Sequence, residues 1–335
     1  MRKKTFLLLI LSIWCVAGTN LLKPSYSIDF LITVKTDKSV YNVGEIVNIS
    51  GNLTYNGEPV SDALVAIQVN DRAIPITYRT VCTGATPPGP WEVEIVDVYL
   101  SDGSGNPITN AKRGSEYQIR INYKNNEAYA IHALIAFTVY DCNNTPMFAL
   151  IPVATEVQPG GPWTVFAPWR VPEEAELGTA TIYANAYSDY PQNHGTPHCP
   201  EKSYTFDIFS STGLGLSAEA TTVMMQAPEG FYSSLRIPKY MARLGNYAVY
   251  VATFYYTGQI GLFAYESTTF QAILRGDVDG SGCVDIFDAV IIALAFGSCP
   301  DDPNWDPRAD TIEDGLIDIF DMVVIALHFG EEAIP

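Results

Sequence analysis

The chain has 335 residues, of which 47% are hydrophobic and 17% are charged, and its formal net charge is −18 at pH 7. This length allows two or three domains that each bury a core, and it excludes a peptide or a lone small module. The negative charge is concentrated at one end, because residues 277–335 hold 11 Asp and 3 Glu against one Arg, a balance of −13. A segment this acidic repels nucleic acid and attracts cations.

The N-terminus, "MRKKTFLLLILSIWCVAG", has a basic start and then an apolar run over residues 6–17, with small residues near Ser25 and Ser27. This pattern is typical of a secretory signal peptide over residues 1–27, so we predict a secreted or cell-surface protein. No later stretch approaches the ~18 apolar residues that a membrane helix needs, and we expect no membrane span in the mature chain.

Three Asn-x-Ser/Thr sequons suit an exported chain and predict glycosylation at Asn48, Asn52 and Asn143. In "VNISGNLTY" the apolar residues take one parity and both asparagines take the other, so a strand there would point both asparagines at water.

Five cysteines follow the signal peptide, with no CxxC pair among them. Export permits disulfides, and the pair that we favour is Cys142 with Cys199. Cys283 and Cys299 are disfavoured, because a helix between them would hold the sulfurs farther apart than the ~6 Å span of a disulfide.

Residues 28–273 have the composition of β structure, with many Tyr, Val, Thr and Ile. Stretches such as "LVAIQVND" and "EYQIRINYKNN" alternate apolar and polar residues and end in Asn or Asp. Turn signals such as "SDGSGNP" interrupt them at short intervals, a pattern that favours antiparallel β-sandwiches. No helical period of useful length appears before residue 285.

Two parts of this region resemble immunoglobulin-like (Ig-like) domains. The stretch "VKTDKSVYNVGEIVNISGNLTYNGEPVSDALVAIQVND", in residues 28–91, resembles the macroglobulin-type domains of bacterial and archaeal surface proteins. Residues 92–208, opening "WEVEIVDVYLSDGSGNP", resemble an adhesion-type Ig-like sandwich. The resemblance implies that both parts fold as antiparallel sandwiches.

Residues 28–91 supply only the opening strands of a sandwich, and residues 209–272 supply only closing strands. Each half alone would expose an apolar face and an open strand edge. We therefore predict one discontinuous sandwich, with residues 92–208 inserted as a complete second domain. The remaining segment, residues 273–335, forms a separate C-terminal module.

The C-terminal module contains a repeated unit, "GDVDGSGCVDIFDAVIIALAFGS" and, 33 residues later, "DTIEDGLIDIFDMVVIALHFGE". Calcium takes six to eight oxygen ligands, which a loop delivers at alternate positions around a turn made by Gly. In the first copy the ligands are expected to be Asp277, Asp279, Ser281, Cys283 through its carbonyl, Asp285 and Asp288. In the second copy they are expected to be Asp310, Asp314, Leu316 through its carbonyl, Asp318 and Asp321. Ile312 takes the third position and offers no oxygen, so we predict two calcium sites of which the second is weaker.

Both copies carry Asp at the twelfth position, and no helix-like segment precedes either loop, which departs from an EF-hand. The unit resembles the dockerin module, a duplicated calcium loop and helix, here of the archaeal type. The resemblance covers about 60 residues and implies a small all-α fold that docks on a cohesin-type protein. It places the partner-binding residues just after the ninth ligand, at Ile286, Phe287, Ile319 and Phe320. An alternative interpretation buries these four residues inside the module or against the last sandwich.

Two functions fit the sequence. The favoured one is a non-catalytic exported protein whose sandwiches act as spacer or adhesion modules and whose dockerin binds calcium and a cohesin. The alternative is a carbohydrate-binding or polysaccharide-degrading component of a cohesin–dockerin system. No GxSxG, HExxH or P-loop motif occurs, so we expect no enzyme. Trp163 and Trp169 are candidates to stack on sugar rings, although aromatic residues of sandwiches commonly fill cores.

Overall fold

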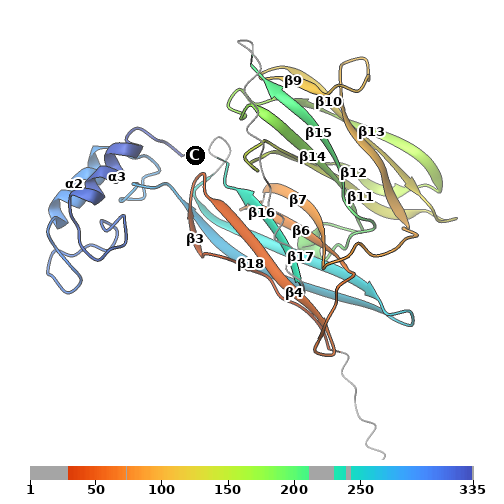
Figure 1. Cartoon of the computed structure of the whole chain (residues 1–335), viewed down its shortest axis with the longest axis horizontal. Helices are drawn as coiled ribbons and strands as arrows, with labels where there is room; N and C mark the ends of the chain where they lie inside the picture. The colour runs from red at the N-terminus through yellow and green to blue at the C-terminus, as the bar shows by residue number, and fades with distance from the viewer. Residues whose placement is uncertain (1–28, 73, 211–229, 239–242, 334–335) are drawn as a thin grey trace, which may run out of the picture.

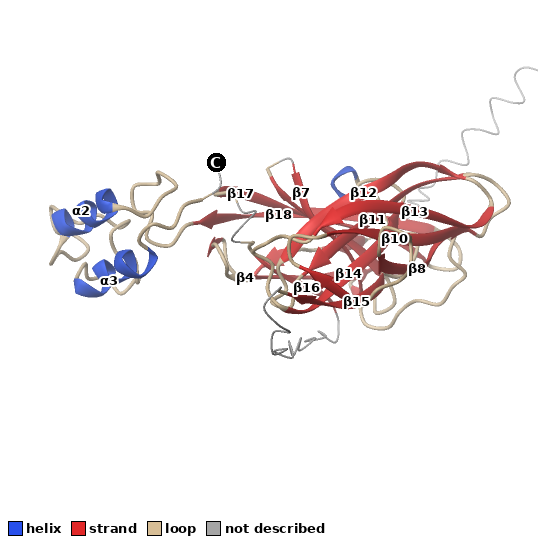
Figure 2. Ribbon diagram, turned by 90° about the horizontal axis from the view of Figure 1, so that it is seen from above, coloured by secondary structure: helices blue, strands red, loops and turns tan. Residues whose placement is uncertain are grey.

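The computed structural model describes residues 29–72, 74–210, 230–238 and 243–333, so the predicted signal peptide lies outside the described residues. The protein is mainly β. Figure 1 shows two groups of strands side by side and, at one end, the two short helices of the C-terminal module. The view from above in Figure 2 shows that this module projects from the end of strand β18.

The first sandwich is built from two five-stranded sheets. One sheet has the order β1-β4-β16, with β2 and β5 also paired to β4, and the other has the order β3-β18-β17-β6-β7. The strands before residue 91 are β1 (Phe30–Ile32), β2 (Lys35–Thr36), β3 (Val40–Asn42), β4 (Ile46–Tyr55), β5 (Glu58–Pro59), β6 (Leu64–Asp71) and β7 (Ile74–Cys82). The strands after residue 229 are β16 (Gly230–Arg236), β17 (Gly245–Tyr256) and β18 (Gly261–Ile273).

Strands from the two ends of the chain pair in both sheets of the first sandwich. β16 is antiparallel to β4, with Ser233 opposite Ile49, and β17 is antiparallel to β6, with Val249 opposite Val69. β18 runs parallel to β3. The alternate side chains of these strands enter one buried core, which includes Val47, Leu235 and Val249. This is the strand pairing that a discontinuous sandwich requires.

The second sandwich lies between the two halves of the first in sequence. Its sheets have the orders β13-β10-β8 and β12-β11-β14-β15-β9. The strands are β8 (Val93–Ser101), β9 (Asn110–Lys112), β10 (Glu116–Asn125), β11 (Ile131–Tyr140), β12 (Pro146–Val157), β13 (Gly160–Arg170), β14 (Gly178–Tyr187) and β15 (Lys202–Phe209), with a short 3-10 helix η1 (Pro191–Asn193) after β14. Phe137 and Trp169 lie in its core, so Trp169 is not available to stack on a sugar.

The two sandwiches pack on each other through β7, which contacts β11, β12 and β14. Tyr78, Leu134 and Tyr187 are buried there in a small apolar cluster. Beside it, Arg79 of the first sandwich forms an ion pair with Glu201 of the second at 2.9 Å. The contact therefore combines buried apolar area with a paired charge.

The predicted disulfide is wrong, because all five described cysteines are free. The Cys142 thiol lies 3.3 Å from the carbonyl of Leu177, just before β14 begins. The Cys199 thiol accepts a hydrogen bond from the amide of Ile95. The amide of the neighbouring His198 donates to the carbonyl of Ala186, which places Cys199 near the other end of β14. At ~3.3 Å per residue, the eight steps along β14 from residue 178 to residue 186 span about 26 Å, far beyond the reach of a disulfide.

The sequons differ in accessibility. Asn52 and Asn143 are both exposed, whereas Asn48 is half-buried. The alternation predicted that Asn48 points freely at water, and this is wrong. Its Nδ2, the atom that would carry a glycan, donates to Asp37 at 2.9 Å. Its Oδ1 accepts from the Tyr232 hydroxyl of the neighbouring strand at 2.6 Å. Neighbouring chain segments, which strand parity alone does not reveal, cover this asparagine.

The C-terminal module contains helices α2 (Ile286–Ala295) and α3 (Ile319–His328). Its core is formed by Val284, Ile292, Ile317 and Ile325, with Leu274 entering directly after β18. In the described part of the chain, no helix is long and apolar enough to cross a membrane.

Candidate metal centre and docking surface

The first acidic loop begins four residues after β18 ends and leads into α2. Gly282 adopts a φ of 88°, a backbone conformation that favours glycine. Its amide donates to Asp277 Oδ2 at 2.9 Å, across the turn. The Asp279 carboxylate accepts from the amide of Ser281 at 2.9 Å. These bonds curl the loop so that its side-chain oxygens gather on one side.

Asp288, the twelfth residue of the loop, closes it from the first turn of α2. Its side chain is fully buried, and its Oδ1 accepts from the amides of Val278 at 2.6 Å and Asp279 at 3.0 Å. Its Oδ2 accepts from the amide of Asp285, the N-cap residue of the helix, at 2.8 Å. Helix capping and loop closure therefore depend on the same carboxylate.

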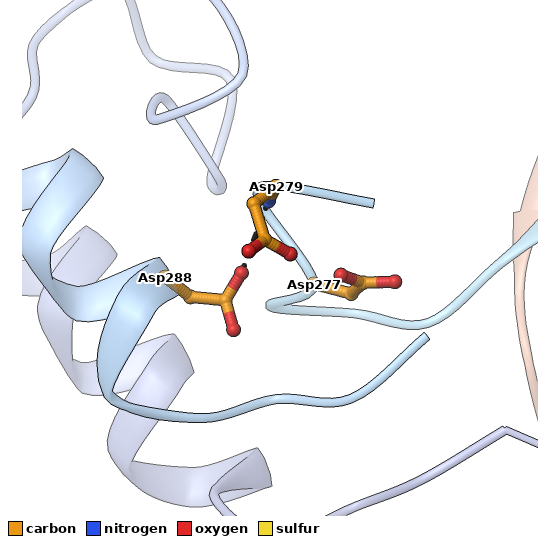
Figure 3. A group of neighbouring side chains, drawn as sticks. All are labelled: Asp277, Asp279 and Asp288. Atoms are coloured by element: carbon orange, nitrogen blue, oxygen red, sulfur yellow. Dashed lines mark hydrogen bonds between the residues drawn. The ribbon is translucent and has the colours of Figure 1, made fainter. Parts of the chain in front are cut away.

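Three carboxylates of this loop converge, as Figure 3 shows for Asp277, Asp279 and Asp288. One ligand oxygen from each lies within 4.8 Å of the others. In the described residues, this is the one group of three Asp, Glu, His or Cys side chains gathered so closely. Asp285 instead caps α2 by accepting from the amide of Phe287 at 2.7 Å.

The electrostatics of the loop favour a bound cation. Burial, together with the nearby Asp288 carboxylate, raises the pKa of Asp277. The hydroxyl and amide of Ser281 lower the pKa of Asp279 and keep it charged. Adjacent carboxylates repel each other unless a cation compensates them. The Ser281 hydroxyl also lies 3.2 Å from the carbonyl of Cys283, so two further oxygens of the predicted set are adjacent. These hard oxygen donors fit calcium.

The second loop repeats the backbone scaffold of the first. The amide of Gly315 donates to Asp310 Oδ2 at 2.9 Å, and the amide of Asp318 donates to Asp321 Oδ2 at 2.8 Å. Asp321 is fully buried, as Asp288 is. The two loops differ at the third position. The Ile312 amide donates to Asp321 Oδ1, but its side chain has no oxygen that could bind a cation. The scaffold is complete, whereas the ligand set is one oxygen short.

We expect Ile312→Asp to tighten calcium binding by the second loop about tenfold or more, because it supplies the missing carboxylate on an existing scaffold. Titration calorimetry on the full mature chain would measure this gain. Ile312→Ala is the matched control, since it removes the same side chain without adding an oxygen. Equal affinities of the two variants would contradict the assignment of ligand positions.

The two loops are tied to each other through backbone bonds. Val284 of the first loop pairs with the segment after α3, through Glu331 at 2.9 Å and Gly330 at 2.8 Å. Ile317 of the second loop pairs with the segment after α2, through Gly297 at 2.7 Å and Ser298 at 3.0 Å. The backbone of each loop is therefore hydrogen-bonded to the segment that follows the other helix, so a cation held in one loop would stabilise both.

Both helices expose an apolar stripe. The four predicted partner-binding residues are all exposed, at 58% for Ile286, 65% for Phe287, 57% for Ile319 and 61% for Phe320. The interpretation that buried them in the core is wrong. The capping boxes explain the exposure, because they turn Asp288 and Asp321 inward and leave the two residues after each N-cap outside.

Sequence reasoning missed six further residues of these stripes. Val290, Leu294 and Phe296 are exposed on the first helix segment, and Val323, Leu327 and Phe329 are exposed on the second. The sequence signal was present, because the five exposed positions carry the same residues, Ile, Phe, Val, Leu and Phe, at an offset of 33. We call these two sets of five residues the helix stripes.

No protein-family model and no curated protein matches the chain. Among solved structures, an alkylpurine DNA glycosylase AlkC of Pseudomonas fluorescens, bound to DNA with an abasic site analog, is 7% identical over 36% of this chain. The chain covers 31% of the glycosylase, with a TM-score of 0.28. The C-terminal domain of wzt is 10% identical, covering 37% of this chain and 77% of that domain, with a TM-score of 0.30.

A CARDB domain from Pyrococcus furiosus, in complex with di-metal ions, is 11% identical. The match covers 36% of this chain and 97% of that domain, with a TM-score of 0.23. Likenesses this distant assign no function to the chain.

Proposed function

We propose that the protein is a non-catalytic exported component whose C-terminal module acts as a calcium-dependent dockerin. Its two calcium loops, the second weaker, fold and stabilise α2 and α3. The helix stripes then dock on a cohesin-type partner, and the β-sandwiches serve as spacer or adhesion modules outside the cell.

The observation that carries this proposal is the pair of helix stripes. Ten large apolar side chains are 43% to 75% exposed on a module whose own core is small. Contiguous exposed apolar surface is costly in water and marks interaction sites. Because the stripes have identical residues on equivalent helices, either one can present the same surface to a partner.

The surrounding charge fits the same role. Residues 277–335 carry a balance of −13, which disfavours nucleic acid and anionic surfaces. Calcium neutralises part of this charge at the loops, close to the start of each stripe. The metal therefore brings both a folded helix and a less negative surface, so docking depends on calcium.

The test is binding of the full mature chain to immobilised cohesin domains, with calcium and with chelator. We expect Phe287→Ser and Phe320→Ser each to leave the affinity within about twofold, because the other stripe still binds. The double variant is expected to lose about 50-fold or more, since each buried Phe contributes about 2–3 kcal/mol.

Phe166→Ser is the matched control, because Phe166 is exposed to a similar degree, at 55%, but lies on the second sandwich. It should bind as the unmodified chain does. A double variant with full affinity, or binding that persists in chelator, would refute the dockerin assignment.

A further inference from the structure

The outer face of strands β17 and β18 in the first sandwich is uncharged. Alternate residues of these strands enter the core, including Val249, Val251 and Phe270. The outward positions include Asn246, Ala248, Tyr250, Ala252, Phe254 and Tyr256 on β17, and Phe263, Tyr265, Ser267, Thr269 and Gln271 on β18. We call this set the β17–β18 face. Glu266, the one charged residue of β18, has the opposite parity.

Aromatic rings occupy one half of the β17–β18 face. Phe263 is 68% exposed and Tyr256 is 61% exposed. The rings of Phe254 and Phe263 lie side by side across the strand pair, with centroids 4.8 Å apart. Tyr265 follows two residues along β18, and the ring of His194, after η1, lies 4.1 Å from it. Alternate residues of a strand are ~6.6 Å apart, so these rings form a continuous row.

Hydroxyl and amide side chains occupy the other half of the face. Ser267, Thr269 and Gln271 continue the same row along β18, and all three are exposed. On the adjacent strand, Ala248 and Tyr250 are half-buried and Ala252 is fully buried, so most exposed groups of this half come from β18. The face therefore offers ring surfaces and uncharged hydrogen-bonding groups in one elongated strip.

This strip discriminates between classes of ligand. In a chain with a net charge of −18, the exposed residues of this face carry no ionised carboxylate or ammonium group, so the surface is neutral. Phosphates, nucleic acids and acidic sugars find no charge there to pair with. A lipid surface would cover the aromatic half but would dehydrate the hydroxyl and amide half.

We propose that the β17–β18 face binds an extended chain of a neutral polysaccharide. The aromatic rings contact the C–H faces of the sugar rings, and Ser267, Thr269 and Gln271 bond to sugar hydroxyls. The candidates named from sequence are elsewhere, because Trp169 is buried and Trp163 lies on β13 of the second sandwich. This binding is independent of the C-terminal module.

The first experiment is native electrophoresis of the full mature chain in gels that contain a neutral polysaccharide. Galactomannan, laminarin and hydroxyethylcellulose are the neutral probes, and polygalacturonate is the acidic comparison. We expect at least one neutral probe to retard the protein and polygalacturonate not to do so. Retardation should be unchanged between low and high salt, because no charge is paired. Migration unaffected by all three neutral probes overturns the proposal.

The second experiment locates the site. Phe263→Ala and Tyr265→Ala are each expected to weaken retardation about tenfold, which corresponds to the loss of one aromatic contact. Phe166→Ala should have no effect, because its exposed ring lies on the other sandwich. Thermal unfolding confirms that each variant is folded.

Wild-type retardation of a folded Phe263→Ala variant contradicts the proposal. The face could instead bind a second copy of the chain, seen as a dimer in sedimentation velocity, or a lipid surface, seen as flotation with neutral phospholipid vesicles. If Phe263→Ala abolishes either association and leaves polysaccharide binding intact, the proposal is also contradicted. Loss of cohesin binding with retained polysaccharide binding bears only on the C-terminal module, so the two proposals fail separately.

Discussion

Asp288→Ala is expected to abolish calcium binding by the first loop, with an affinity loss of about 100-fold or more. The buried carboxylate is one of the three that converge, and it also accepts three backbone amides that shape the loop and cap α2. Its removal takes away a ligand and leaves those buried donors unpaired. Titration calorimetry on the full mature chain measures the effect, with circular dichroism to follow the helices.

Two comparisons make this result specific. Glu332→Gln also removes one negative charge from the module but no loop ligand, and should bind calcium as the unmodified chain does. Asp321→Ala removes the equivalent residue of the second loop and should eliminate only the weaker site directly. Tight calcium binding by Asp288→Ala would show that the metal is held elsewhere.

Arg79→Ala is expected to destabilise the sandwiches by about 3–5 kcal/mol, because it leaves a buried Glu201 carboxylate without its partner. The side chains of both residues are only 11% exposed. The guanidinium bonds to both oxygens of Glu201, at 2.9 and 3.0 Å, and lies 3.6 Å from the centre of the Tyr183 ring. Burial by itself lowers the pKa of Arg79, but the Glu201 carboxylate more than offsets this and raises the pKa above its usual value, so Arg79 stays charged.

Urea unfolding of the full mature chain measures this loss. The double variant Arg79→Met with Glu201→Leu should lose much less than Arg79→Ala, because both charges leave the interface together. Lys38→Ala is the exposed control. It breaks the pair with Glu45 at 3.4 Å, where the side chains are 55% and 35% exposed, and should cost under about 1 kcal/mol. A cost for Arg79→Ala as small as that of Lys38→Ala would contradict the buried-pair argument.

The sequence by itself determined the features that depend on neighbouring residues. Period-two alternation predicted strands such as β6 and β10, because side chains of a strand alternate between two faces. The spacing of Asp277, Gly282 and Asp288 predicted a loop that closes on its helix, and the structure shows these backbone contacts. The duplication at an offset of 33 predicted the second loop and its missing oxygen at Ile312.

Only the tertiary structure decided the features that join distant residues. Tyr232 covers Asn48 across 184 residues of sequence, and Arg79 meets Glu201 across 122. The sequence did not exclude a disulfide between Cys142 and Cys199, because it does not show that the two residues lie near opposite ends of β14. Strand alternation separates two faces but does not say which face a second sheet covers. The exposure of the helix stripes and of the β17–β18 face therefore followed from packing, because burial depends on what the rest of the chain brings alongside.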